Sequence, residues 1–149
     1  AKYANKSKKK AWALEPLSIA NLTLFKGKSF YIINQYSVSH FFEAIRSSFN
    51  LLQFSLFFLN IIKHTIHEEQ ENQDLFKLIV STLTQLNETK NIQKANIDFL
   101  HSYIKLEGLF PSNTSTLSIK QAHQIISNYL GQYISSPIQL DELAGTPVK

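Results

Sequence analysis

The spacing of the apolar residues changes near His40, and this change divides the chain into two parts with different predicted folds. From Leu17 to Phe25 the apolar residues mostly alternate with polar ones, and residues 30–33 are all aromatic or β-branched. Because a Lys-Gly-Lys turn lies between these two runs, the pattern predicts a β-hairpin. Beyond His40 the apolar residues recur every three or four positions, which is typical of one face of a helix.

The longest predicted helix directly follows His40. Its apolar residues keep the i, i+3, i+4 spacing for about six turns. They are Phe42, Ile45, Phe49, Leu52, Leu56, Leu59 and the run Ile62–Ile66. Further apolar residues flank this row, so we expect a helix at the centre of a bundle. Residues 44–62 contain a single charge, Arg46, but polar side chains interrupt the run, which favours a buried bundle helix over a membrane span.

Three further helices are predicted after a charged connection. One begins near Asn72, the next covers Ile92–Ile104 and stops before Gly108, and the last covers about residues 118–133. The expected fold class is therefore α+β, with N-terminal β strands followed by an all-α helical bundle.

The net charge of +4 originates in one short segment. Residues 1–10 contain five lysines and no acid, whereas the rest of the chain carries ten basic and eleven acidic residues. Five like charges repel one another, so the segment is predicted to be a solvated basic loop. Mobile cations beside aromatic rings suit nucleic acid, because neutralised phosphates release counterions and bases stack on the rings. The candidate DNA-binding residues are Lys2, Lys6, Lys8, Lys9, Lys10, Trp12, Lys26 and Lys28.

Composition and motifs argue against an enzyme. The absence of cysteine excludes a disulfide scaffold, thiolate catalysis and Cys-ligated metal, and four isolated glycines leave no Walker loop or dinucleotide fingerprint. The His-x-x-His-Glu string at 64–68 matches no zinc-protease pattern, and Lys63 beside it opposes cation binding. We therefore expect no catalytic residues, no metal and no cofactor. The chain also contains no methionine, so residues are expected to precede Ala1.

Six segments carry motifs of one bacterial family, in the family's own order. The basic opening is similar to an AKGAR-xxKS element, and residues 22–28 are similar to an LELxxYRGR turn. Residues 74–79 are similar to a PxLFxLL helix, and residues 129–130 fall in a match to an LLxxYLxxHLG helix. The matching segments are Ala1–Lys10, Ala13–Ser18, Leu22–Lys28, Asp74–Ile79, Phe99–Pro111 and Ile125–Leu143. Together they resemble the RecO family of recombination mediators over most of the chain.

The chain departs from the family pattern at two places. Many family members carry a cysteine-based zinc motif after the third helix, whereas this chain passes from Pro111 to Ser118 without a cysteine. The family's Tyr-Arg-Gly-Arg turn is Phe-Lys-Gly-Lys at residues 25–28, which keeps the charge but loses the bidentate phosphate geometry of arginine. The zinc site is therefore not expected here.

The resemblance implies a domain order and a role. It implies a partial OB-fold nucleic-acid-binding domain at 1–38, whose first strands precede Ala1, and a helical domain at 39–143. The residues that follow, 144–149, are expected from the sequence itself to form a disordered tail. It also implies a non-enzymatic cytoplasmic protein, associated with the nucleoid, that binds single- and double-stranded DNA. Such proteins anneal strands coated with single-stranded-DNA-binding protein, and they work with RecR to load the recombinase RecA.

Two other readings of the residues remain open. In the first, the chain is a helical protein–protein interaction module whose basic arm only keeps it soluble. In the second, it associates with a membrane through residues 44–62. DNA binding across a salt series distinguishes the first of these from a DNA-binding protein.

Overall fold

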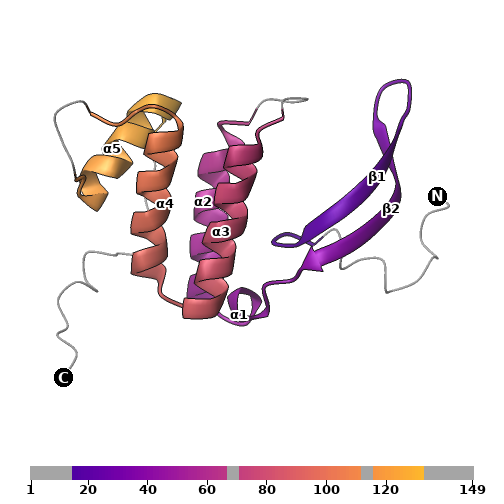
Figure 1. Ribbon diagram of the computed structural model, residues 1–149, viewed down its shortest axis with the longest axis horizontal. Helices are drawn as coiled ribbons and strands as arrows, with labels where there is room; N and C mark the ends of the chain where they lie inside the picture. The colour runs from indigo at the N-terminus through magenta and orange to yellow at the C-terminus, as the bar shows by residue number, and fades with distance from the viewer. Residues whose placement is uncertain (1–14, 67–70, 112–115, 133–149) are drawn as a thin grey trace. The chain divides into compact units, whose positions relative to one another are not determined.

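The computed structural model describes residues 15–66, 71–111 and 116–132 of the 149-residue chain. Within these ranges, a two-stranded antiparallel sheet precedes five helices (Figure 1). The chain divides into two compact units, residues 1–43 and residues 44–149. The predicted α+β class is confirmed. The predicted tail at 144–149 lies outside the described residues.

The first unit contains the predicted hairpin. Strand β1 (Ile19–Lys26) pairs with strand β2 (Tyr31–His40). The backbone N–H of Gly27 donates to the carbonyl oxygen of Phe30 at 2.9 Å and closes the turn. A Cβ atom on residue 27 would lie 2.8 Å from that same oxygen, so this turn needs glycine at its first position. The prediction of a hairpin around Gly27 is therefore confirmed.

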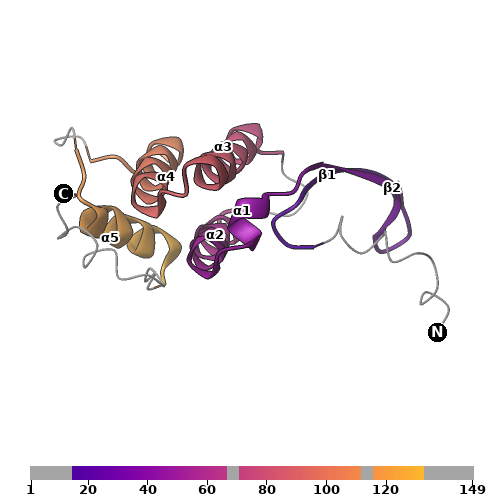
Figure 2. The same cartoon turned by 90° about the horizontal axis from the view of Figure 1, so that it is seen from below.

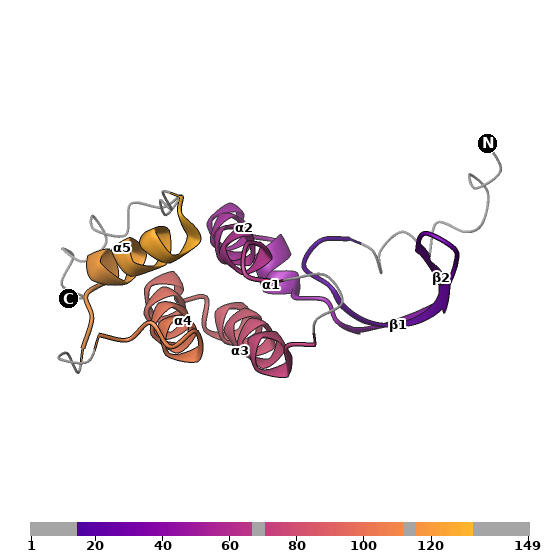
Figure 3. The same ribbon diagram turned by 90° about the horizontal axis from the view of Figure 1, so that it is seen from above.

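The second unit contains one short helix and four longer ones. Helix α1 (Glu43–Arg46) and helix α2 (Phe49–Lys63) come first. Helices α3 (Gln73–Thr89), α4 (Ile92–Leu106) and α5 (Ile119–Leu130) follow. Three of the four predicted helix positions are thus confirmed. Figures 2 and 3 show the long helices in two layers, with α3 beside α4 in one layer and α2 beside α5 in the other.

The prediction of one continuous helix over residues 42–66 is wrong. The chain leaves the helical conformation at Ser47 and Ser48, and Ser48 has the extended angles φ −126° and ψ 120° at the start of α2. The separate first turn is stabilised by Asn87 of α3. Its Oδ1 accepts hydrogen bonds from the backbone N–H of Ala44 at 3.0 Å and of Ile45 at 3.4 Å. These are donors that the first turn of a helix leaves without an intrahelical partner.

The buried face of α2 also differs from the predicted row. The row included Phe49 and Leu56, which are 70% and 47% exposed. The apolar side chains that α2 buries are Leu51, Phe54, Phe58, Ile61 and Ile62. The helix is apolar on so many sides that the period alone does not select a face. The break at residues 47 and 48 then restarts the helix in a different orientation.

The core of the helical unit is built around aromatic rings from α2 and α4. Phe58 and Phe99 lie 5.1 Å apart between ring centroids, and Phe54 and Tyr103 extend the cluster at 5.9 Å and 5.8 Å. Helix α2 also packs on α3, and its Phe57 ring meets His123 of α5. It therefore contacts the other three long helices, as we expected of a central helix.

The side chain of Asn72 caps the N-terminus of α3. Its Oδ1 accepts a hydrogen bond from the backbone N–H of Leu75 at 2.9 Å. We expect Asn72→Ala to lower the free energy of unfolding by about 1 kcal/mol, because it leaves that backbone donor without the side-chain partner. Urea denaturation measures the change. Gln73→Ala is the matched control at the next, exposed position, and a loss as large as that of Asn72→Ala would contradict the capping role.

Candidate nucleic-acid interface

Two of the eight predicted DNA-binding residues fall within the described ranges. Lys26 ends β1 and Lys28 lies in the turn that follows, and both side chains are exposed. The other six predicted contacts lie outside the described residues. They are Lys2, Lys6, Lys8, Lys9, Lys10 and Trp12.

Lys26 is held beside an aromatic ring. It lies directly opposite Tyr31 across the hairpin, and residues opposite each other in an antiparallel pair project to the same face. The ammonium group of Lys26 lies 5.9 Å from the centroid of the Tyr31 ring, which is within cation–π range. A positive charge and an aromatic surface therefore occur together at the tip of the hairpin.

One face of the hairpin is apolar from its base up to the pair Lys26 and Tyr31 at its tip. The pairs on this face join Leu22 to Tyr36 and Leu24 to Ile33, with Ala20 opposite Val38 beyond them. We call these six residues the apolar face. Its side chains Leu22, Leu24, Ile33 and Val38 are between 40% and 46% exposed. Such a face has the composition of the buried side of a sheet.

A bulge keeps the apolar residues of β2 on that single face. Their positions change from odd numbers, at Tyr31 and Ile33, to even numbers, at Tyr36 and Val38. The register shifts between Thr23 and Leu24, whose partners are Gln35 and Ile33, so Asn34 has no residue opposite it. A shift of one position along a strand normally moves a side chain to the other face of the sheet. The extra residue in β2 cancels this shift, so the apolar residues before and after it lie on the same face.

The opposite face is polar at its base and aromatic at its tip. Asn21 lies opposite Ser37 and Thr23 lies opposite Gln35, and we call this side the polar face. Towards the turn the same side carries Phe25, opposite Ile32, and these side chains are 60% and 51% exposed. In the turn itself, Phe30 is 68% exposed.

We call Phe25, Lys26, Lys28, Phe30 and Tyr31 the tip cluster. The sequence predicts its two lysines as DNA contacts but not its three aromatic residues, because the apolar pattern accounts for Phe25, Phe30 and Tyr31 as strand residues. The signal was present in the sequence, since within residues 25–31 two lysines flank Gly27 and aromatic residues stand on either side of them.

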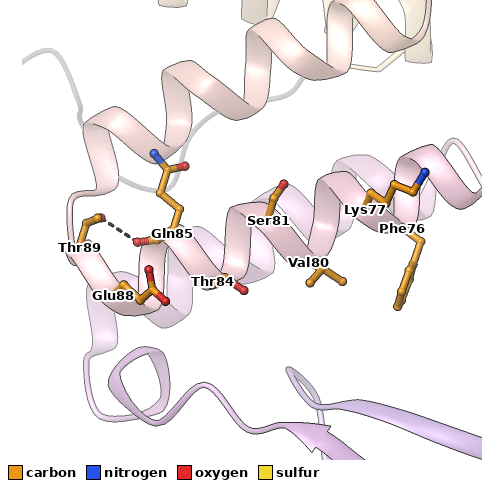
Figure 4. A pocket seen from close by; sticks show the side chains of 8 residues that line it. All are labelled: Phe76, Lys77, Val80, Ser81, Thr84, Gln85, Glu88 and Thr89. Atoms are coloured by element: carbon orange, nitrogen blue, oxygen red, sulfur yellow. Dashed lines mark hydrogen bonds between the residues drawn. The ribbon is translucent and has the colours of Figure 1, made fainter.

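The described helices carry a groove but no cluster of metal ligands. An open groove of about 530 Å³ runs along α3, where Figure 4 shows Phe76 and Val80 on one side of the helix. Its lining is Phe76, Lys77, Val80, Ser81, Thr84, Gln85, Glu88 and Thr89. Within the described ranges, no three His, Asp or Glu side chains lie close enough together to hold a metal ion.

Within the described part of the helical unit, the titratable groups with a shifted pKa are two tyrosines with structural roles. Burial raises the pKa of Tyr103 to about 12, although its hydrogen bond with Thr65 acts in the opposite direction. The hydrogen bond that Tyr129 donates to the Glu107 carboxylate, at 2.8 Å, raises the pKa of Tyr129. Both tyrosines therefore stay neutral at physiological pH and join segments of the bundle. Among the described helices, none has the length and apolar composition needed to cross a membrane.

No protein-family model and no solved structure matches this chain. Several curated proteins do, and all are named DNA repair protein RecO. The protein from Alkaliphilus metalliredigens is 31% identical over 124 residues, which cover 81% of this chain and 50% of that protein. The one from Clostridium perfringens strain SM101 is 30% identical over 88 residues, covering 58% of this chain and 39% of that protein. The one from Caldanaerobacter subterraneus is 28% identical over 116 residues, which cover 74% of this chain and 46% of that protein. The chain thus spans about half the length of the curated relatives it matches or less.

Proposed function

Since this chain belongs to the RecO family of DNA repair proteins, we propose that it acts in DNA repair by binding DNA as a recombination mediator, without catalysing a reaction. The observation that carries the proposal is the tip cluster, where the exposed cations Lys26 and Lys28 stand among exposed aromatic side chains. This is the combination with which proteins bind single strands, since cations meet the phosphates and rings meet the bases.

The basic N-terminal segment extends this surface in the proposal. Its five lysines and the two of the tip cluster give seven of the fourteen lysines of the chain within the first 28 residues. A concentration of cations in one region releases counterions from the phosphate backbone and gives an affinity that does not depend on base sequence.

We further propose that the hairpin is part of an OB-type barrel whose other strands lie outside the described residues. An isolated two-stranded hairpin is at best marginally stable in water, and the apolar face of this hairpin is only partly covered. Closing a barrel would bury that face and leave the polar face, with Phe25 at its tip end, outside. Nucleic acid binds OB-folds through their outer strand face and loops.

The proposed mediator activity follows from charge. Two complementary strands repel each other through their phosphates, and a cationic protein surface lowers that repulsion while the bases pair. Such annealing needs no nucleotide hydrolysis. In this proposal the strands are coated with single-stranded-DNA-binding protein, and RecR cooperates in loading the recombinase, in the cytoplasm at the nucleoid.

Fluorescence anisotropy with labelled single-stranded and duplex oligonucleotides of two unrelated sequences tests the proposal. We expect binding to both forms, independent of sequence. For single strands, the logarithm of the association constant should fall with the logarithm of salt concentration with a slope of about −5, if all seven lysines neutralise phosphates at about 0.7 per contact. Undetectable binding at 50 mM salt would contradict DNA binding and would favour an interaction module with a solubilising arm.

A further inference from the structure

We propose that the tip cluster is a base-stacking subsite for unpaired DNA, and that Phe25 and Phe30 are its stacking residues. This proposal rests on the proposed DNA-binding function and specifies which form of DNA the tip selects. The lysines of the cluster hold the phosphates of either form, whereas the two phenylalanine rings bind only bases whose faces are open.

Phe25 would stay exposed even if further strands covered the apolar face of the hairpin. The side of the hairpin suited to burial is the apolar face, and Phe25 projects from the opposite side, in line with Thr23 and Gln35. Strands that cover the apolar face therefore leave Phe25 exposed. A polar face does not need an aromatic ring for folding, and an exposed apolar cluster on it indicates a binding site.

The turn presents Phe30 on the same side. Because Gly27 carries no side chain, the Phe30 ring lies over it, with Cδ2 4.0 Å from the place where a Cβ atom would be. The hydrogen bond between the Gly27 N–H and the Phe30 carbonyl fixes the backbone of residue 30. Phe30 therefore presents its ring from an ordered turn, which reduces the entropy lost when a base stacks on it.

The charges of the tip identify the occupant as nucleic acid. Lys28 lies between Gly27 and Phe30 in the turn, and Lys26 is held over the Tyr31 ring on the other face. No acidic residue occurs between Glu15 and Glu43, so the hairpin carries only positive charge. An apolar protein partner would not require these cations, whereas a strand of alternating bases and phosphates matches rings and ammonium groups together.

Base accessibility makes the subsite selective. In a duplex each base is paired and stacked between its neighbours, so a protein ring cannot reach its face without unstacking it, which costs a few kcal/mol per step. In a single strand the faces are open. Loss of an aromatic ring should therefore weaken single-strand binding alone, while loss of a lysine should weaken the binding of both forms.

Phe30→Ala tests the subsite, with affinities measured for a single-stranded 15-mer and for the matching duplex. We expect the variant to bind the single strand about tenfold more weakly and the duplex with unchanged affinity. Phe30→Tyr should keep the affinity of the original protein, whereas Phe30→Leu should behave like alanine because it is apolar but has no aromatic face. Phe49→Ala is the matched control, since Phe49 is 70% exposed on the helical unit and Phe30 is 68% exposed.

The outcomes separate the subsite from the proposed function. Equal losses on single-stranded and duplex DNA, full binding by Phe30→Leu, or an equal effect of Phe49→Ala would each overturn the stacking subsite while leaving DNA binding intact. Absence of DNA binding by the unmodified chain would overturn both proposals, and would direct the search towards a protein partner for the tip. Equal thermal unfolding midpoints for the Phe30 variants and the unmodified protein establish that the comparison is between folded proteins.

Discussion

Replacing Lys8, Lys9 and Lys10 by glutamate is expected to weaken single-stranded DNA binding by a factor of about one hundred or more at moderate salt. The change removes three phosphate contacts and places three negative charges where the DNA backbone would lie. At about 0.7 counterions per contact, the salt slope should become shallower by about two. Duplex DNA should be affected as strongly, because both forms present phosphates.

The matched control for this variant reverses Lys90, Lys94 and Lys120, which are exposed on the helical unit. It makes the same change in net charge, and we expect it to change the affinity by no more than about threefold, since these lysines are not among the proposed phosphate contacts. Anisotropy titrations at several salt concentrations measure both variants. If the control triple weakened DNA binding as much as the first, net charge rather than the basic segment would account for the affinity.

Phe99→Ala is expected to lower the free energy of unfolding by about 3–5 kcal/mol. Phe99 is fully buried and its ring packs between Phe58 of α2 and Tyr103 one turn away, so truncation leaves a cavity where two helices meet. Because small domains are stable by only about 5–15 kcal/mol, the variant should unfold at markedly lower urea concentration. Chemical denaturation followed by circular dichroism measures the loss.

Phe49→Ala provides the same chemical change on the surface. Phe49 is 70% exposed at the start of α2, so we expect a change in unfolding free energy within about 0.5 kcal/mol. The sequence pattern predicts Phe49 in the buried row, and this comparison therefore also tests the face that the structure buries. A loss at Phe49 as large as that at Phe99 would mean that the row predicted from the sequence is the buried one.

Features determined by a few neighbouring residues were predictable from the sequence. The hairpin follows from the alternation of apolar and polar residues on either side of Gly27. A side chain at position 27 would lie too close to the carbonyl oxygen of Phe30, so the turn needs glycine there. The start of α3 follows from Asn72, whose side chain accepts the hydrogen bond of the Leu75 N–H. In both cases the interaction lies within four residues, so the local sequence carries all the necessary information.

Features determined by tertiary contacts were not predictable. The break after α1 depends on Asn87, which lies more than forty residues away in the sequence and holds the backbone of Ala44. The buried face of α2 depends on where Phe99 and His123 approach it. A helix that is apolar on most sides has no periodic signal that distinguishes among these directions.

The candidate site divides in the same way. Its lysines were predictable because a concentration of charge is visible in composition alone. Its aromatic residues were not, because Phe25 and Leu24 are equally apolar neighbours in one strand. Only the register, with its bulge at Asn34, places Leu24 on the apolar face and Phe25 on the other.

Lysine acetylation footprinting with and without single-stranded DNA tests the central claim most directly, because one experiment reports on every lysine of the chain. We predict that DNA protects the lysines of the basic segment and of the tip cluster, Lys2, Lys6, Lys8, Lys9, Lys10, Lys26 and Lys28. The exposed lysines of the helical unit, among them Lys63, Lys90, Lys94 and Lys120, should react at unchanged rates. Protection of the helical lysines, with unchanged reaction of the first seven, would contradict the account.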